Sequence, residues 1–116
     1  MAITLKTNSV GGAGFIANGY SADWSGCETL VAAVTGKSIY IERIYINAHD
    51  AEIFTFGAGE TTGSVTTIVL GPLSCPADTI VELVFTRPLF ITATTAFVVD
   101  AAAAGDATII VQGYIK

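Results

Sequence analysis

From Thr29 to the end of the chain, apolar residues alternate with polar residues in short runs. Val, Ile, Thr, Phe and Tyr dominate these runs, and turn residues recur about every eight to twelve positions. This spacing predicts antiparallel β-strands separated by tight turns. We expect strands at residues 29–34, 38–48, 51–57, 65–70, 79–85, 89–94, 96–100 and 107–115, with a further short strand around 3–7.

One of these strands changes phase halfway along. Ile39 and Ile41 share one face, whereas strict alternation would place Ile44 and Ile46 on the opposite face. One extra residue near positions 42–43, a β-bulge, would return all four isoleucines to the same face and bend the strand. The alternative is a strand buried on both faces, by the core on one side and by a partner subunit on the other.

Three further strands show inward-facing apolar rows. These rows are Phe54 with Phe56, then Val81, Leu83 and Phe85, and finally Ile109, Val111 and Ile115. About eight short antiparallel strands with such turns indicate a single all-β domain, an antiparallel β-sandwich of jelly-roll type over residues 29–116. The pattern does not separate a jelly roll from an immunoglobulin-like sandwich.

Residues 1–28 differ from the rest because they are rich in glycine and show neither helical nor strictly alternating periodicity. We predict an N-terminal arm here, which lies over the sandwich or reaches a neighbouring molecule. Tyr20, Asp23 and Trp24 are close together in this segment and could form an aromatic platform for a sugar. We favour the alternative that Trp24 pins the arm to the core, because tryptophan buries a large area.

The composition favours an oligomer. Hydrophobic residues make up 52% of the chain and charged residues only 13%, about half the usual share. We therefore expect a neutral surface that is partly covered by other subunits. Arg87-Pro88 indicates an edge strand or a break, and packing around a symmetry axis would protect such an edge. Arg87 could pair across a subunit boundary with Glu42 or Glu82, although a solvated charge is the favoured interpretation.

Charge and hydropathy argue against nucleic-acid and membrane partners. The net charge is −5, and the five cationic residues are scattered, whereas a phosphate-binding surface needs clustered cations. No apolar run approaches the roughly 18 residues of a membrane-spanning helix. The N-terminus lacks a basic start followed by an apolar block, so we expect that it is not a secretory signal. We expect the chain to be made in a cytoplasm.

Few residues suggest reactive chemistry. The single histidine, His49, could serve a weak metal site or act as a base beside Asp50 or Glu52, but a polar hairpin tip is favoured. Cys27 and Cys75 are expected to be reduced thiols, with a disulfide as the alternative. Nucleophile elbows, phosphate loops and four-ligand zinc patterns are missing from the sequence. We expect no enzyme, no catalytic residues, no cofactor and no metal.

Four segments of the chain carry a recognisable combination of strands and turns. They are residues 30–46, with "LVAAVTGKSIYIERIYI", 71–73, with "GPL", 88–99, with "PLFITATTAFVV", and 108–114, with "TIIVQGY". Together these segments resemble small β-sandwich virion proteins of tailed bacteriophages. The resemblance implies a jelly-roll-like domain that assembles on a phage particle as a homotrimer. Capsid decoration (cement) is the favoured place, with a neck or tail appendage or a fibre base as alternatives.

The partners expected from this resemblance are copies of the chain itself and the major capsid protein or another virion protein. The acidic balance suits the outside of a shell. A carbohydrate-binding module for attachment to surface glycans, using Trp24, Tyr20 and Tyr114, is the alternative of a different class. The residues expected to contact partners are Phe15, Tyr20, Trp24, Tyr40, Arg43, Arg87 and Tyr114.

Overall fold

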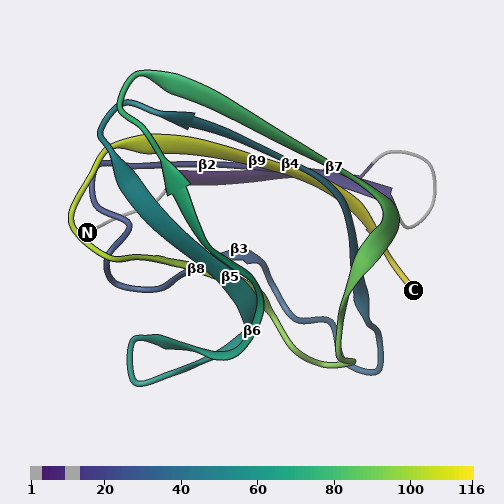
Figure 1. The fold of residues 1–116 in the computed structure, drawn as a ribbon. Helices are drawn as coiled ribbons and strands as arrows, with labels where there is room; N and C mark the ends of the chain where they lie inside the picture. Colours follow the sequence, from purple (N-terminus) through teal and green to yellow (C-terminus); the bar gives the residue numbers. More distant parts are fainter. Residues whose placement is uncertain (1–3, 10–13) are drawn as a thin grey trace.

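The structure, a computed structural model, describes residues 4–9 and 14–116. Within these residues, nine strands form two antiparallel sheets packed face to face (Figure 1). The five-stranded sheet has the order β1-β2-β9-β4-β7, and the four-stranded sheet has the order β3-β8-β5-β6. The strands are β1 (Thr4–Ser9), β2 (Gly14–Ser21), β3 (Glu28–Val31), β4 (Ile39–Ala48), β5 (Glu52–Thr61), β6 (Ser64–Cys75), β7 (Thr79–Ile91), β8 (Phe97–Ala101) and β9 (Ala107–Ile115). The predicted all-β sandwich is confirmed.

The strands pair as a nested series. β5 pairs with β6, β4 with β7, β3 with β8 and β2 with β9, and every pair is antiparallel. Except at the β5–β6 hairpin, each connection from β2 onward carries the chain from one sheet to the other. As a result, strands far apart in sequence become neighbours, and β2, β9 and β4 lie side by side.

The β-bulge predicted in β4 is confirmed. Ile41 is opposite Gly113 of β9, and Arg43 is opposite the next partner, Gln112, so Glu42 is the extra residue. All four isoleucines of β4 are fully buried between the sheets, as the bulge requires. The bulge therefore keeps both halves of β4 facing the core and turns Glu42 and Arg43 to the outside.

The core lies between the two sheets and is dominated by large apolar side chains. Phe54, Phe56, Ile109 and Val111 are fully buried, as their alternation predicts. The expected row in β7, residues 81–85, is only partly buried, although it packs against the core. This difference arises because β7 is the edge strand of its sheet.

Two expectations about strand boundaries are wrong. Residues 14–21 are not part of an irregular arm, because they form β2, which pairs with β1 on one side and β9 on the other. The inward positions of β2 include Ala17, Gly19 and Ser21, which are too small or polar to show a hydrophobic period. The expected strand at 3–7 falls on β1, and its first residue, like residues 1, 2 and 10–13 of the expected arm, lies outside the described residues.

The expected strands at 79–85 and 89–94 are one strand, β7, which continues through Pro88. The pairing with β4 jumps from Val84 to Leu89, so residues 85–88 oppose the single residue Glu42. Because the hydrogen-bonding pattern is interrupted there and β7 has no neighbour beyond it, a proline is tolerated. The prediction that Pro88 marks an edge is confirmed.

Candidate interaction surface

The outer face of the five-stranded sheet carries a strip of three aromatic rings. Tyr114 of β9, Tyr40 of β4 and Phe90 of β7 are direct cross-strand neighbours. The rings of Tyr40 and Tyr114 are stacked with centroids 4.8 Å apart, and Phe90 is tilted against Tyr40 at 5.4 Å. Such pairs stabilise a sheet. Phe90 nevertheless keeps 52% of its surface exposed.

The rest of this outer face carries further exposed apolar side chains among polar ones such as Asn18 and Gln112, and one ion pair. Ile16, Ile80 and Val84 have 40%, 60% and 62% of their surface exposed. Arg43 and Glu82, each about half exposed, form a pair with Nε and Oε2 3.7 Å apart. An exposed pair of this kind adds little stability. Exposed large apolar side chains gathered on one sheet face are a common feature of interaction surfaces.

A cleft lies beside the aromatic strip, and we call it the Tyr114 slot. Its volume is about 280 Å³, and its lining consists of Gly14, Phe15, Ile16, Glu42, Gln112, Gly113 and Tyr114. Tyr40 covers one face of the Tyr114 ring, and the cross-strand neighbour on the other side is Gly14, which has no side chain. The second face of the Tyr114 ring consequently borders the slot. The bulge in β4 brings Glu42 to its wall.

The expected contact residues fall into two groups. Tyr40, Arg43 and Tyr114 lie together on the outer face described above. Tyr20 lies on the same face of β2, 45% exposed, and its hydroxyl donates a 3.0 Å hydrogen bond to Asp106, which raises the pKa of Tyr20. Arg87 is exposed on the edge strand β7.

Phe15 and Trp24 belong to the core, so the expectation that they are surface contacts is wrong. Phe15 has 4% of its surface exposed and only borders the floor of the slot, and Trp24 is fully buried. The Trp24 Nε1 donates a 2.9 Å hydrogen bond to the carbonyl of Ala107. This confirms that Trp24 pins the N-terminal segment to the core and removes it from the proposed sugar platform.

Sequence reasoning missed three residues of this surface. The sequence predicts Phe90 in a separate strand and Ile16 in an irregular arm. Gln112 lies on the outward face of β9, and nothing local in the sequence indicates that it lies next to Glu42. The phase change in β4 was the available signal, because a bulge turns its extra residue outward.

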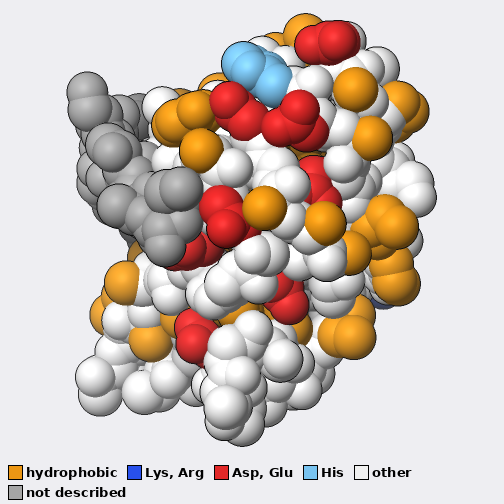
Figure 2. Space-filling view, turned by 90° about the vertical axis from the view of Figure 1, so that its left-hand side faces the viewer, with side chains coloured by type: hydrophobic (Ala, Val, Ile, Leu, Met, Phe, Trp, Pro, Cys, Tyr) orange, Lys and Arg blue, Asp and Glu red, His pale blue; other side chains and the backbone are white. Residues whose placement is uncertain are grey.

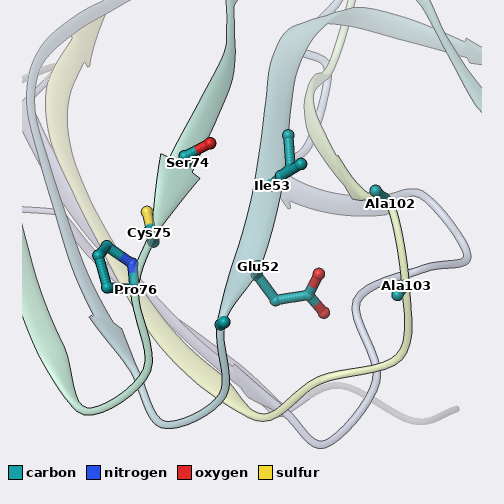
Figure 3. A pocket seen from close by; sticks show the side chains of 8 residues that line it. Glu52, Ile53, Ser74, Cys75, Pro76, Ala102 and Ala103 are labelled. Carbon is teal, nitrogen blue, oxygen red and sulfur yellow. The ribbon is translucent and has the colours of Figure 1, made fainter.

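A second cavity lies beside Glu52 at the start of β5 (Figure 3). Its volume is about 360 Å³, and its lining consists of Ala51, Glu52, Ile53, Ser74, Cys75, Pro76, Ala102 and Ala103. Only 5% of the surface of Glu52 is exposed to solvent, and its carboxylate extends towards Ala103 (Figure 3). Its Oε2 has no hydrogen-bond partner within the described part of the chain.

Burial raises the pKa of Glu52 above its ordinary value of 4.5. The charges of Asp23 and Asp50 raise it further, while hydrogen bonds from the backbone amides of Ala103 and Ile53 act in the opposite direction. The carboxylate is therefore less stable in the folded protein than in the unfolded chain. Among the described residues, Glu52 is a buried acid without an ion-pair partner, and burial also raises the pKa of the neighbouring Cys75 thiol.

Replacing Glu52 with glutamine should change how stability depends on pH. Because the folded-state pKa is raised, the folded protein binds the proton more tightly, and stability is lost as the pH rises from 4.5 through the raised value. Glu52→Gln should therefore be more stable than the natural chain at neutral pH, with the difference vanishing below the ordinary pKa. Urea unfolding across this pH range measures it, with the exposed Glu60→Gln on the same strand as the control. A difference independent of pH would contradict the assignment.

His49 and several acidic residues lie around the turn between β4 and β5. His49 lies in the β4–β5 turn, with Nδ1 3.7 Å from Asp106 Oδ1, and Asp50 accepts a hydrogen bond from the Asp106 amide. Acidic side chains gather below this histidine on the face shown in Figure 2. In residues 4–9 and 14–116, no group of three or more His, Cys, Asp or Glu side chains could hold a metal ion.

The two cysteines are separate buried thiols. Burial, with help from Glu60, Asp100 and Glu28, raises the pKa of Cys27 to about 11, which keeps its thiol protonated at neutral pH. A protonated, buried thiol is a poor nucleophile. Among the described residues, the exposed apolar side chains of the five-stranded sheet and the two cavities are candidate contact sites for other molecules.

Comparison with known proteins gives no family assignment. No family model matches the chain, and no curated protein matches it either. Within the part of the chain that the structure describes, no helix has the length and apolar character needed to cross a membrane.

Proposed function

We propose that this protein is a structural component of a tailed-phage virion that works as an oligomer, with decoration of the capsid exterior as its favoured place. The observation that carries the proposal is the apolar outer face of the five-stranded sheet. The core between the two sheets is already filled by buried side chains, so the exposed apolar side chains of this face lie outside the core and are open to a partner.

The strand arrangement supports the same proposal. Nested antiparallel pairs that alternate between two sheets correspond to two Greek keys, and we interpret them as a jelly roll, an architecture found in viral capsid proteins. The sequence resemblance to small virion proteins implies the same architecture. The acidic side chains gathered on one face (Figure 2) suit exposure to solvent on the outside of a particle.

The mechanism would be mechanical and not chemical. Copies of this chain, as a homotrimer, would associate through the apolar face and bridge neighbouring subunits of the major capsid protein. A protein that binds the assembled lattice and not its dissociated subunits stabilises the lattice by mass action. Purified oligomer added to undecorated shells should therefore raise their resistance to heat.

A matched pair of isoleucines tests the proposal. Ile80 on the outer face and Ile68 on β6 of the other sheet are both 60% exposed. Ile80→Asp should weaken self-association at least about tenfold, because it places a charge in an apolar interface, whereas Ile68→Asp should leave association unchanged. Sedimentation equilibrium measures the oligomer, and a heat-release assay measures shell protection. A natural chain that stays monomeric at high concentration would sink the proposal.

The alternative places, a neck or tail appendage or a fibre base, belong to the same structural class. Locating the chain by electron microscopy of the particle separates them from capsid decoration. The carbohydrate-binding alternative is less favoured because Trp24 is buried in the core and cannot contact a sugar. Its other two aromatic residues, Tyr20 and Tyr114, lie in different cross-strand rows of the sheet.

A further inference from the structure

We propose that the Tyr114 slot binds an arginine side chain, and that this arginine is Arg87 of a second copy of the chain. The inference rests on the proposed function, since it names the contact through which copies associate.

The slot presents the groups that recognise a guanidinium. The ring face of Tyr114 that Tyr40 leaves uncovered offers a surface for stacking, and Glu42 supplies a carboxylate at the wall. Gln112 adds an amide, and Ile16 provides apolar contact for a side-chain stem. A planar guanidinium stacks on aromatic rings and forms paired hydrogen bonds with a carboxylate, whereas a lysine ammonium is a compact, strongly hydrated charge.

Other ligand classes fit the slot less well. A hydrated divalent cation would need several oxygen ligands, and the lining contains one carboxylate. A sugar could stack on Tyr114, but a single carboxylate in an uncharged lining favours a cation. The described residues also show Glu42 without an ion-pair partner, although it is partly buried.

Arg87 is the arginine available for this contact. The sequence contains two arginines, and Arg43 already pairs with Glu82 in its own chain. Arg87 is exposed and, within residues 4–9 and 14–116, forms no ion pair or hydrogen bond. It lies in residues 85–88, where the pairing with β4 is interrupted and the edge of the sheet is irregular.

Arg87 forms no ion pair with the carboxylate of the slot in its own chain, although residues 85–88 of β7 lie opposite Glu42 on β4. The slot lies over β2 and β9 with Glu42 at its wall, so its other side faces away from β7. A contact from Arg87 of one copy to the slot of another can be reciprocal, as in a two-fold dimer, or can run from copy to copy and close into a ring such as a trimer. Sedimentation equilibrium of the natural chain distinguishes the two.

A charge-reversal cycle on the full chain tests the contact by sedimentation equilibrium. Arg87→Glu and Glu42→Arg should each weaken association at least about tenfold, while the double variant should recover to within a few-fold of the natural chain. Arg87→Lys should give an intermediate loss, because it keeps the charge but loses the planar stack. Lys37→Glu, the same charge reversal at another exposed cation, is the control.

A direct binding measurement gives a second readout. N-methylguanidinium added to the Arg87→Glu variant should shift the NMR signals of the Gln112 side-chain amide, and Glu42→Gln should abolish the shift. Circular dichroism of each variant establishes that it is folded. If the natural chain associates, Ile80→Asp disrupts it and the charge reversals do not, the Arg87 assignment falls while the proposed function stands. A monomeric natural chain overturns both, and a shift by a monosaccharide in place of the guanidinium would make the slot a glycan site.

Discussion

Replacing Trp24 with alanine should lower the free energy of unfolding by about 3–5 kcal/mol, the range for truncating a large buried aromatic side chain. Trp24 is fully buried, and its removal would leave a cavity that the neighbouring strands cannot fill. The loss would also free the carbonyl of Ala107, which now accepts the indole hydrogen bond. Urea unfolding followed by circular dichroism measures the change.

The effect of Trp24 extends beyond its own area because it connects both sheets. Its side chain bonds Ala107 at the start of β9, and its carbonyl accepts a 3.0 Å hydrogen bond from the amide of Ala101 at the end of β8. Trp24→Phe should lose less than alanine, since it keeps most of the apolar contact but leaves the Ala107 carbonyl unpaired, at a cost of about 1–3 kcal/mol. Phe90→Ala, which removes a half-exposed ring, should cost less than about 1 kcal/mol. Equal losses at Trp24 and Phe90 would contradict this account.

Alternation predicted most of the core because it depends on a period that each strand carries by itself. The four isoleucines of β4 predicted the position of the bulge, because a strand without a bulge cannot bury all four on one face. β2 escaped detection because Ala17, Gly19 and Ser21 occupy its inward positions. The continuation of β7 through Pro88 was missed because a proline excludes a central strand but not an edge strand.

The interaction surface was less predictable because it depends on which strands become neighbours. Tyr40 and Tyr114 are 74 positions apart in numbering, and their stacking follows only from the pairing of β4 with β9. The slot needs a third strand, β2, with a glycine opposite Tyr114. No local pattern in the sequence specifies such a combination. The general expectation of apolar outward positions nevertheless followed from the low share of charged residues.

Replacing Gly113 with alanine should lower the free energy of unfolding by about 1–3 kcal/mol, as overpacking in a rigid site does. A Cβ at this position would overlap the carbonyl oxygen of Tyr40 and lie 3.0 Å from its carbonyl carbon and 3.2 Å from Ile41 Cα. These are backbone atoms of the paired strand, so relief requires β4 and β9 to separate. The bulge at Glu42 is next to this contact.

The same substitution connects stability with association. Because Gly113 borders the Tyr114 slot, any displacement of β4 moves Glu42 relative to the Tyr114 ring. Gly113→Ala should therefore weaken self-association as well as lower the free energy of unfolding. Sedimentation equilibrium measures the association in buffer without urea, where the variant is folded. Gly26→Ala is the matched control, since a Cβ there meets no atom within 4 Å, and it should change stability by less than about 0.5 kcal/mol. If both alanine variants unfold at the same urea concentration, the close approach of β9 to the bulge does not constrain the fold, and the slot loses the feature that positions its carboxylate.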